Sequence, residues 1–355
     1  MLMRALLAAA LVLPAVPASA QFYKGKTLTL LVNYGVGGNA DTEARIYQRY
    51  LPKYIAGNPT VIIRNVPGAG GAAAINQLGL NIASQPDGLT AGYFTTSATT
   101  SLTEDPSLRV KLYDFNVIGA AGGFNVVYAR KDIVPGGMAK PADIVRARNV
   151  YAGGYARSTS HDTRLRLALE ILGLPYTMVT GFPGTAQVNK AMLQNEVNFS
   201  GSSLPGYHTQ VIPQIINPGI GMTLFQFPAM APDGTPIGDP ALERAGIQTF
   251  DKVYAQAFGK PPTSPKFEAL LLMNDISTKL QRLIVLPKGA PGDAVDALRA
   301  AVGALGEDKD FIEDYMRVTG EEPDLIKADA IEPLFQRMRH VDPEVVRILK
   351  ESIAE

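Results

Sequence analysis

Loops rich in glycine, hydroxyl and amide residues offer the main chemistry in this sequence. A glycine-rich run at 35–38 leads into Asn39, a Thr-Thr-Ser run occupies 95–97, and similar loops lie at 153–160 and 181–184. Glycine lets an anion approach the backbone closely, and the free N–H groups at a helix start attract negative charge. Three or four hydrogen bonds of about 1.5–3 kcal/mol each could hold a small anion with micromolar affinity. The loops therefore predict a small-anion site; alternatively, the glycines only form turns and close packing.

Motifs for other chemistries are incomplete or missing. Gly35-x-Gly37-Gly38 lacks the full dinucleotide spacing, and neither a P-loop nor a G-x-S-x-G nucleophile elbow occurs. His161-Asp162 could form half of a catalytic triad, but a His beside a helix start more often caps or packs. Asp41 is expected to cap its helix rather than bind a metal. The chain has no Cys and three His, which excludes thiol chemistry and leaves little material for a transition-metal site.

Length, composition and charge limit the classes of protein further. With 355 residues and 46% apolar residues, the chain is long enough for two domains and too apolar for wholesale disorder. Lys plus Arg number 33 and Asp plus Glu number 33, so the formal charge is zero. A neutral chain has no basic surface for nucleic acid, and we expect no nucleic-acid partner.

The elements that must position these loops alternate along the chain. Short apolar runs predict strands at 27–32, 61–63 and 89–94, and helical spacing predicts helices near 39–51 and 72–82. Strands that alternate with helices form an open sheet with helices on both faces. Ligands of such sheets bind outside the carboxyl ends of the strands, which is where the glycine-rich loops lie.

A second block repeats this alternation. Strands are predicted at 124–129, 150–152, 176–180 and 197–199. A helix is marked by the apolar stripe Leu165, Ala168, Leu169 and Leu172. The run at 283–286 predicts a strand that returns to the first block, and a helix follows near 295–305. The sequence therefore predicts two α/β lobes, with residues 21–122 and 283–355 in lobe I, residues 123–282 in lobe II, and two crossing strands as the hinge.

The N-terminus has the pattern of a cleaved signal peptide. A positive start at Arg4 precedes a nine-residue apolar run, prolines break this run, and Ala18-Ser19-Ala20 offers small residues to a signal peptidase. We predict cleavage after Ala20 and a soluble exported product, located in the periplasm; the alternative is an anchor or a disordered start. No Cys follows the run, so a lipoprotein anchor is excluded.

Several of these loops resemble the signature of a known family. The segments are Asn33-Tyr34-Gly35-Val36-Gly37-Gly38-Asn39-Ala40-Asp41 with Arg45, Arg64-Asn65-Val66-Pro67-Gly68-Ala69-Gly70-Gly71, Pro86-Asp87-Gly88, Ser160-His161, Gly181-Phe182-Pro183-Gly184-Thr185 and Leu286-Pro287-Lys288-Gly289-Ala290-Pro291. In this order they resemble the Bug or TctC receptors, the extracytoplasmic solute-binding proteins of tripartite tricarboxylate transporters.

The resemblance implies a two-lobed type II periplasmic-binding-protein fold, each lobe an open, mostly parallel sheet flanked by helices. It also implies capture of a carboxylate-bearing small molecule in the cleft and its delivery to membrane permease subunits. By the same resemblance, the first-lobe ligand contacts are Tyr34, Gly37, Gly38, Asn39, Asp41, Thr95, Thr96 and Ser97. The second-lobe contacts are Gly153, Gly154, Tyr155, Arg157, Ser158, Thr159, Phe182 and Gly184.

One loop departs from the family pattern, which commonly has small residues where Tyr155 and Arg157 stand. Tyr155 could stack on a ring or fill the cleft. Arg157 could pair bidentately with a carboxylate, or it could point to solvent. The departure puts the usual ligands of the family, such as citrate, Asp or Glu, in doubt.

We therefore expect a monomeric solute receptor for a small organic anion, with no enzymatic activity, no cofactor and no metal. Two alternatives remain. A periplasmic hydrolase on the same architecture would need a positioned nucleophile and base, which the sequence does not offer. A sensor that presents its bound ligand to a signalling partner would use the same cleft.

Overall fold

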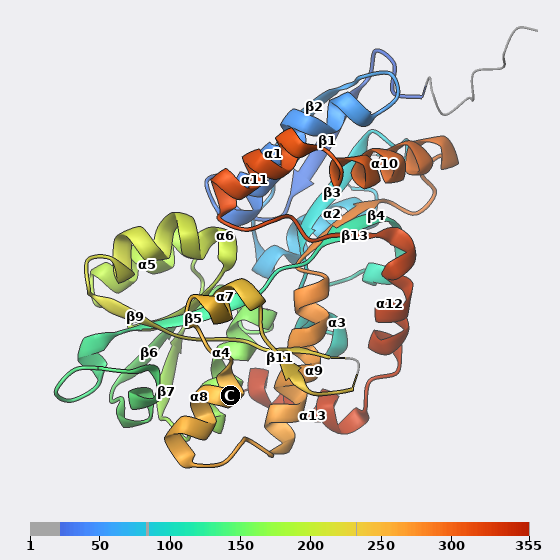
Figure 1. Ribbon diagram of the computed structural model, residues 1–355. Coiled ribbons are helices and arrows are strands. Elements are labelled where there is room, and N and C mark those ends of the chain that lie inside the picture. Colours follow the sequence, from blue (N-terminus) through green and yellow to red (C-terminus); the bar gives the residue numbers. More distant parts are fainter. Residues whose placement is uncertain (1–21, 83–84, 232, 355) are drawn as a thin grey trace, which may run out of the picture.

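The computed structural model describes residues 22–82, 85–231 and 233–354, and two sheets lie at the centres of its two α/β lobes (Figure 1). The first sheet has the strand order β13-β4-β12-β3-β1-β2. Its strands are β1 (Thr27–Val32), β2 (Thr60–Asn65), β3 (Thr90–Thr95), β4 (Asn116–Ala121), β12 (Arg282–Leu286) and β13 (Leu325–Lys327). Strands β1 to β4 point one way, while β12 and β13 run opposite to them.

The second sheet has the strand order β7-β6-β8-β5-β9. Its strands are β5 (Asn125–Arg130), β6 (Val150–Gly153), β7 (Tyr176–Val179), β8 (Phe199–Ser203) and β9 (Gly221–Gln226). Only β5 runs against the others, so each sheet has one predominant direction. Two open, mainly parallel sheets flanked by helices confirm the predicted fold class.

One predicted strand is shifted, and three strands of the two sheets, β4, β9 and β13, escaped prediction. β8 continues through residues 201–203, which the sequence places in a loop, because they pair with β5. A side chain at Gly201 would bring its Cβ to 3.2 Å from the Val126 carbonyl oxygen, so the small residues are needed for close pairing. Strands β4 and β9 give no clear alternation in the sequence and were not predicted.

Helices cover both faces of each sheet (Figure 1). The helices that precede the second sheet or follow β12 are α1 (Asn39–Tyr54), α2 (Ala72–Gly79), α3 (Ala98–Leu102), α10 (Gly292–Leu305), α11 (Lys309–Thr319), α12 (Glu332–Arg339) and α13 (Pro343–Ala354). The others are α4 (Ser160–Ile171), α5 (Thr185–Leu193), α6 (Leu204–Gly206), α7 (Pro240–Arg244), α8 (Phe250–Phe258) and α9 (Pro265–Lys279). A π-helical segment spans Tyr207–Ile216, and a small hairpin is formed by β10 (Ala229–Met230) and β11 (Pro236–Ile237).

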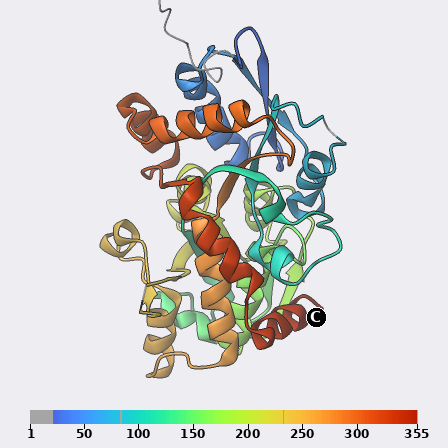
Figure 2. The same ribbon diagram turned by 90° about the vertical axis from the view of Figure 1, so that its right-hand side faces the viewer.

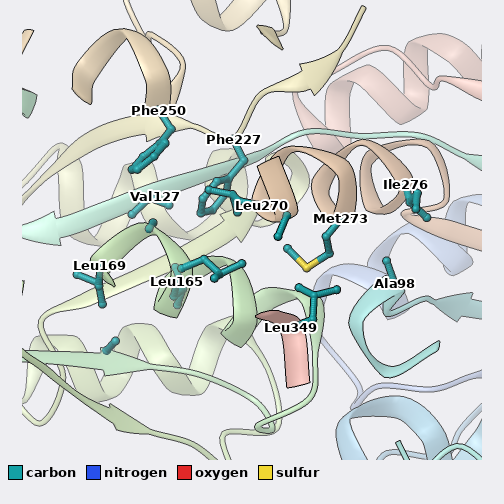
Figure 3. Packing of buried hydrophobic residues seen from close by; sticks show 14 of the residues in the cluster. Ala98, Val127, Leu165, Leu169, Phe227, Phe250, Leu270, Met273, Ile276 and Leu349 are labelled. Carbon is teal, nitrogen blue, oxygen red and sulfur yellow. The ribbon is translucent and has the colours of Figure 1, made fainter. Parts of the chain in front are cut away.

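The predicted apolar stripes pack inside the molecule. In α4, Leu165 and Leu169 are fully buried, and in α10 the residues from Val295 to Leu305 on one face are buried under the first sheet. Figure 3 shows Leu165 beside Met273 of α9 and Leu349 of α13. Fully burying a leucine stabilises the fold by about 1.5–3 kcal/mol, which fixes the orientation of α4 and therefore of its first turn.

Two chain segments cross side by side between the lobes. Gly123, between β4 and β5, donates its N–H to the Thr278 carbonyl at the end of α9, with an N···O distance of 2.9 Å. A Cβ on Gly123 would lie 1.9 Å from the Gln281 side-chain oxygen, so a larger residue here would displace the Gln281 side chain. Strands β5 and β12 begin directly after the crossing, and each runs antiparallel to its neighbours in its own sheet.

The C-terminal helix departs from the predicted lobe assignment. The sequence analysis assigns residues 283–355 to lobe I, whereas α13 packs against α4 and α9, beside the second sheet (Figure 2). Its buried residues Ile348 and Leu349 join the cluster that contains Leu165 and Met273. The remaining lobe boundaries stay a prediction.

The predicted signal peptide at 1–20 lies outside the described residues. Within residues 22–354, apart from the short gaps, no helix is both long and apolar enough to cross a bilayer.

Candidate functional site

A small cavity of about 80 Å³ lies between the lobes at the carboxyl ends of β1, β3 and β6. The lining residues that precede the second sheet in the sequence are Tyr34, Gly38, Asn39, Ala40, Thr95, Thr96 and Ser97. The lining from the second block consists of Asn125, Tyr155, Thr159, Ser160, His161, Arg164, Pro183, Gly184, Thr185 and Ser203, and Ser277, Gln281 and Arg282 complete it from the crossing. Among these described lining residues none is acidic and two are arginines, so the cavity suits an anion.

The first loop is held by its own polar groups. Asn33, directly after β1, donates to the Thr95 carbonyl and accepts from the Thr95 N–H, both at 2.9 Å, and so ties the loops after β1 and β3 together. Gly37, with φ of +77°, donates its N–H to Asp41 at 2.9 Å. Asp41 also accepts two hydrogen bonds from Arg45, at 2.9 and 3.0 Å. Burial opposes ionisation of Asp41, yet the hydrogen bonds from Arg45 and Gly37 lower its pKa below the usual value.

Asn39 crosses the cleft from the start of α1. Its Nδ2 donates to Ser203 Oγ at 2.9 Å and to Thr185 Oγ1 at 3.3 Å, and the same threonine hydroxyl is 2.8 Å from the Tyr155 hydroxyl. A Cβ on Gly206 would lie 2.2 Å from Asn39 Nδ2, so the lobes approach closely here. These contacts close one side of the cavity.

Hydrogen bonds of serine hydroxyls join the two lobes on the other side of the cavity. Ser97 Oγ donates to the Ser158 carbonyl at 3.1 Å and accepts the Ser160 N–H at 3.0 Å. The Thr99 N–H donates to Ser160 Oγ at 3.1 Å. The start of α3 is therefore bonded to the start of α4, and the conformation is closed over the cavity.

The first turn of α4 places His161 at the cavity. Thr159 caps the helix by accepting the Asp162 N–H at 3.2 Å. The His161 ring stacks on Tyr155 with ring centroids 4.2 Å apart, and its Nε2 is buried without a hydrogen-bond partner among the described residues. Burial and the nearby Arg164 lower the pKa of His161 to about 3, so the ring is neutral at physiological pH.

The side chains of His161 and Asp162 have different partners in the described structure. The Asp162 carboxylate accepts the Tyr155 N–H at 2.8 Å and the Thr159 hydroxyl at 3.0 Å, whereas the imidazole stacks on the Tyr155 ring. Burial raises the pKa of Asp162 to about 6, partly offset by these hydrogen bonds. The sequence-based expectation that His161 packs rather than catalyses fits this geometry.

Arg164 contributes a buried positive charge. Its residue surface is 6% exposed, its Nη1 donates to Asn274 Oδ1 at 2.9 Å, and its guanidinium lies 5.7 Å from the Phe227 ring centroid. Asn274 is itself fixed, since its Nδ2 donates to the Pro228 carbonyl at 2.6 Å. Burial lowers the pKa of Arg164 to about 10, so the side chain stays charged at neutral pH. In the part of the chain that the structure describes, no carboxylate forms an ion pair with it.

Arg282, the second arginine, is already paired. Its Nη2 bonds to Oε1 of the buried Glu43, and the hydroxyls of Tyr93 and Tyr315 donate to the other oxygen of that carboxylate at 3.1 and 3.3 Å. Burial alone would lower the pKa of Arg282, but the Glu43 carboxylate raises it above the usual value. The Nε of Arg282 is buried without a partner in the described structure, and the residue is one of those that line the cavity.

The structure brings nine of the sequence-predicted residues to the cavity wall: Tyr34, Gly38, Asn39, Thr95, Thr96, Ser97, Tyr155, Thr159 and Gly184. It places seven others outside the wall: Gly37, Asp41, Gly153, Gly154, Arg157, Ser158 and Phe182. Of the latter, Arg157 is exposed and its Nη1 donates to the Ala354 carbonyl at 3.2 Å. Its guanidinium therefore meets the C-terminal end of α13 rather than the cavity.

Sequence reasoning missed His161 and Arg164 as part of the wall, although a signal existed. His161 precedes Leu165 by four residues, and Arg164 precedes Ala168 by four residues, so both lie on the buried face of α4. A charged residue on an apolar face is unusual and could have been singled out. Arg282 carried no comparable signal, because its partner Glu43 is remote in sequence.

Comparisons with known proteins show which proteins share this architecture. No family model matches the sequence. A curated relative from Agrobacterium vitis, described as a UPF0065 protein in the TAR-I ttuE-ttuC' intergenic region, is 23% identical over 291 residues, covering 81% of this chain and 80% of the relative.

Solved structures resemble the whole described chain. The periplasmic binding protein BugD has a TM-score of 0.67 at 18% identity, covering 93% of this chain and 98% of BugD. R. palustris Rpa4515 with adipate has a TM-score of 0.65 at 18% identity, with coverage of 93% and 98%. MatC from Rhodopseudomonas palustris with bound malate has a TM-score of 0.60 at 18% identity, with coverage of 93% and 97%. The chain therefore has the fold of the Bug and TctC periplasmic binding proteins, as the sequence resemblance predicted.

Proposed function

We propose that this protein is a periplasmic solute-binding protein that captures a small carboxylate-bearing molecule between its lobes for a tripartite tricarboxylate transporter. The observation that carries the proposal is Arg164, a buried guanidinium in the cavity wall with no acidic partner among the described residues. An unpaired buried charge is costly unless an opposite charge joins it. A ligand carboxylate supplies that charge.

The remaining wall supports the same class of ligand. The Ser277 hydroxyl, which is buried without a partner in the described structure, and the N-terminal turn of α4 border the cavity, and hydrogen bonds to a charged group contribute about 1.5–3 kcal/mol each. The role that the sequence analysis gave to Arg157 falls to Arg164 in this proposal. In the first loop, Gly38 and Asn39 line the cavity, whereas Asp41 lies outside the wall and accepts a hydrogen bond from the Gly37 N–H.

Resemblance in sequence and fold supports the physiological setting. The structural neighbours are binding proteins, and two of them hold the carboxylates malate and adipate. We infer export through the predicted signal peptide, function as a monomer without turnover of the ligand, and delivery to membrane permease subunits. A role as a sensor uses the same cleft, and the genes beside this one distinguish the two.

A thermal-shift screen over monocarboxylates and dicarboxylates tests the proposal. A carboxylate at 100 times its Kd should stabilise the protein by about 2.7 kcal/mol. Arg164→Met, which keeps the apolar stem and removes the charge, should weaken the binding of that carboxylate by about 2–5 kcal/mol.

Arg157→Met is the matched control, because Arg157 lies on the adjoining loop but outside the cavity wall. It should leave the affinity within about 0.5 kcal/mol of wild type. Absence of stabilisation by any carboxylate, or equal effects of the two substitutions, would contradict the proposal. If Arg157→Met weakened binding more than Arg164→Met did, the anion site would lie at Arg157 instead.

A further inference from the structure

Two cavity-lining residues, His161 and Arg164, occupy neighbouring positions on α4, where both can contact one ligand. His161 and Arg164 are three residues apart, so they project from the same helix face with Cβ atoms about 5–6 Å apart. Both line the cavity of about 80 Å³. A molecule that reaches both groups within this space is small, and its two interacting groups lie a few bonds apart.

His161 presents a hydrogen-bond acceptor to the cavity. A neutral imidazole has one N–H and one bare nitrogen. The backbone of Gly153 forms a hydrogen bond that favours the protonated ring, acting against burial and Arg164, which identifies a carbonyl as acceptor of the ring N–H. With the ring proton on Nδ1, the buried Nε2, which has no partner in the described structure, is left as a bare acceptor. The bare Nε2 then needs a donor from the ligand.

The charges around the cavity sum to one positive charge that lacks a counterion. Arg282 is paired with Glu43, and His161 is neutral. Asp162 lies outside the cavity wall, where it accepts hydrogen bonds from the Tyr155 N–H and the Thr159 hydroxyl, and the nearby Arg166 offsets its charge. Arg164 therefore holds the uncompensated charge, which one carboxylate neutralises. A second carboxylate would be buried without a free cation.

The donor that faces His161 is a hydroxyl rather than an ammonium group. No acidic residue occurs among the described lining residues, so a ligand ammonium would be buried beside Arg164 without a counterion. A hydroxyl donates to Nε2 with no charge to compensate. The Ser277 hydroxyl, also buried without a partner in the described structure, can bond to the same ligand.

We propose that the ligand is a small hydroxy monocarboxylate, with its carboxylate on Arg164 and its hydroxyl donating to His161 Nε2. This inference rests on the proposed function and makes it specific. It separates this chain from the structural neighbours that hold the dicarboxylates malate and adipate. His161 is then the residue that determines specificity for the hydroxyl group.

Four acids that differ by a hydroxyl and by a carboxylate test the inference: lactate, propionate, malate and succinate. Calorimetry on the purified wild-type chain should give about tenfold tighter binding of lactate than of propionate, since propionate leaves a buried acceptor unpaired. Lactate should also bind at least tenfold more tightly than malate. L-Alanine, in which an ammonium group replaces the hydroxyl, should bind more weakly than propionate.

His161→Phe keeps a flat ring against Tyr155 and removes the acceptor. In this variant the lactate-to-propionate ratio should fall below about twofold, while the affinity for propionate stays within a few-fold of wild type. Arg164→Met should instead weaken both monocarboxylates together. The wild-type ratios alone decide the matter if His161→Phe does not fold.

Each contrary result has its own meaning. Equal wild-type affinities for lactate and propionate, or a ratio unchanged by His161→Phe, would overturn the role of His161. Tighter binding of malate or succinate would overturn the single-charge argument. Absence of binding by all four acids would overturn this ligand class, whereas the proposed function fails only if no carboxylate stabilises the chain through Arg164.

Discussion

The first loop (residues 34–41) and the first turns of α4 (residues 159–164) border the same cavity but differ in how their polar groups are used. In the first loop, Asp41 is bonded to Arg45 and Gly37, and Asn39 is bonded across the cleft. In α4, His161 Nε2 has no partner in the described structure, and Arg164 has no counterion there. The first loop therefore closes and shapes the cavity, while α4 keeps free groups for a ligand.

The largest effect that separates the two regions should come from Gly38→Val. Gly38 lines the cavity with φ of −78° and ψ of 171°, so valine fits the backbone, but its branched side chain enters the cavity. A Cβ there would lie 3.2 Å from the Gly35 carbonyl oxygen, a contact that a small shift relieves. We expect loss of carboxylate binding by at least about 3 kcal/mol, measured by calorimetry, with a urea midpoint near wild type.

Gly35→Val is the control for this substitution, because a Cβ at Gly35 meets no atom within 4 Å and Gly35 lies outside the cavity wall. It should bind normally. A large loss of stability in Gly38→Val would instead show that the glycine serves packing.

Acid should lower the free energy of unfolding of the wild type, because His161 binds a proton more readily in the unfolded chain. The folded pKa of about 3 lies below the ordinary 6.5, so the unfolded chain binds more protons between these values, and stability falls as the pH falls below about 6.5. Asp162, with its pKa raised to about 6, acts in the opposite direction between about pH 6 and 4. Urea unfolding of wild type and His161→Phe separates the two effects, since Asp162 is common to both.

Between pH 6.5 and 4, the wild type should lose about 2–3 kcal/mol relative to His161→Phe, because each pH unit is worth at most about 1.4 kcal/mol. Parallel stability curves for the two proteins would mean that His161 is charged in the fold. Its Nε2 would then donate rather than accept.

Removing the side chain of Asn39 should have a smaller effect on binding. Asn39→Ala loses the hydrogen bonds to Ser203 and Thr185 that join the lobes, so the closed state becomes less favourable by about 1 kcal/mol and the affinity falls about fivefold. Asn65→Ala, whose Nδ2 bonds to the Tyr34 carbonyl within the same lobe, is the matched control and should cost stability without changing the affinity. Small-angle scattering of the ligand-free proteins should show a more open Asn39→Ala.

The smallest effect is expected at Asp41. Asp41→Asn loses the ion pair to Arg45, whose side chain is 45% exposed, so the change in stability should be about 0.5 kcal/mol at neutral pH. Its lowered folded pKa means that the carboxylate stabilises the fold above about pH 4 and that this contribution is lost as the pH falls through the folded pKa. Carboxylate affinity should stay within twofold; a larger loss would place Asp41 among the ligand contacts.

Short-range signals explain which parts of the fold the sequence predicts. Apolar runs near 27–32 and 283–286 and the stripe from Leu165 to Leu172 depend on spacing alone, and the structure has strands and a helix there. β4 and β9 were missed, because their residues are selected by partners on other strands. The shifted start of β8 has the same cause, since its small residues are fitted to β5.

In the candidate site, too, short-range signals were predictable from the sequence and contacts with distant residues were not. Glycines and capping residues mark the loops, and the family resemblance named Gly38, Asn39 and Thr159 within them, which lie in the cavity wall. Arg157 was singled out because it departs from the family pattern, and it was expected to face the cleft because its loop precedes a helix, but loop position says nothing about the direction of a long side chain. The carbonyl that it meets belongs to Ala354, at the far end of the chain.

The sequence by itself determined the alternation of strands and helices, the loops that reach the cleft and the family that the chain resembles. The first two properties follow from local spacing and from turn and capping chemistry, and the resemblance follows from matching motifs. Only the tertiary structure decided which cation stays free. Arg282 is neutralised by Glu43 from α1, whereas Arg164 meets the amide of Asn274 from α9, a group without charge. The choice depends on which distant side chains the packing brings beside each arginine, and the cost of a buried charge makes that choice decisive for the ligand.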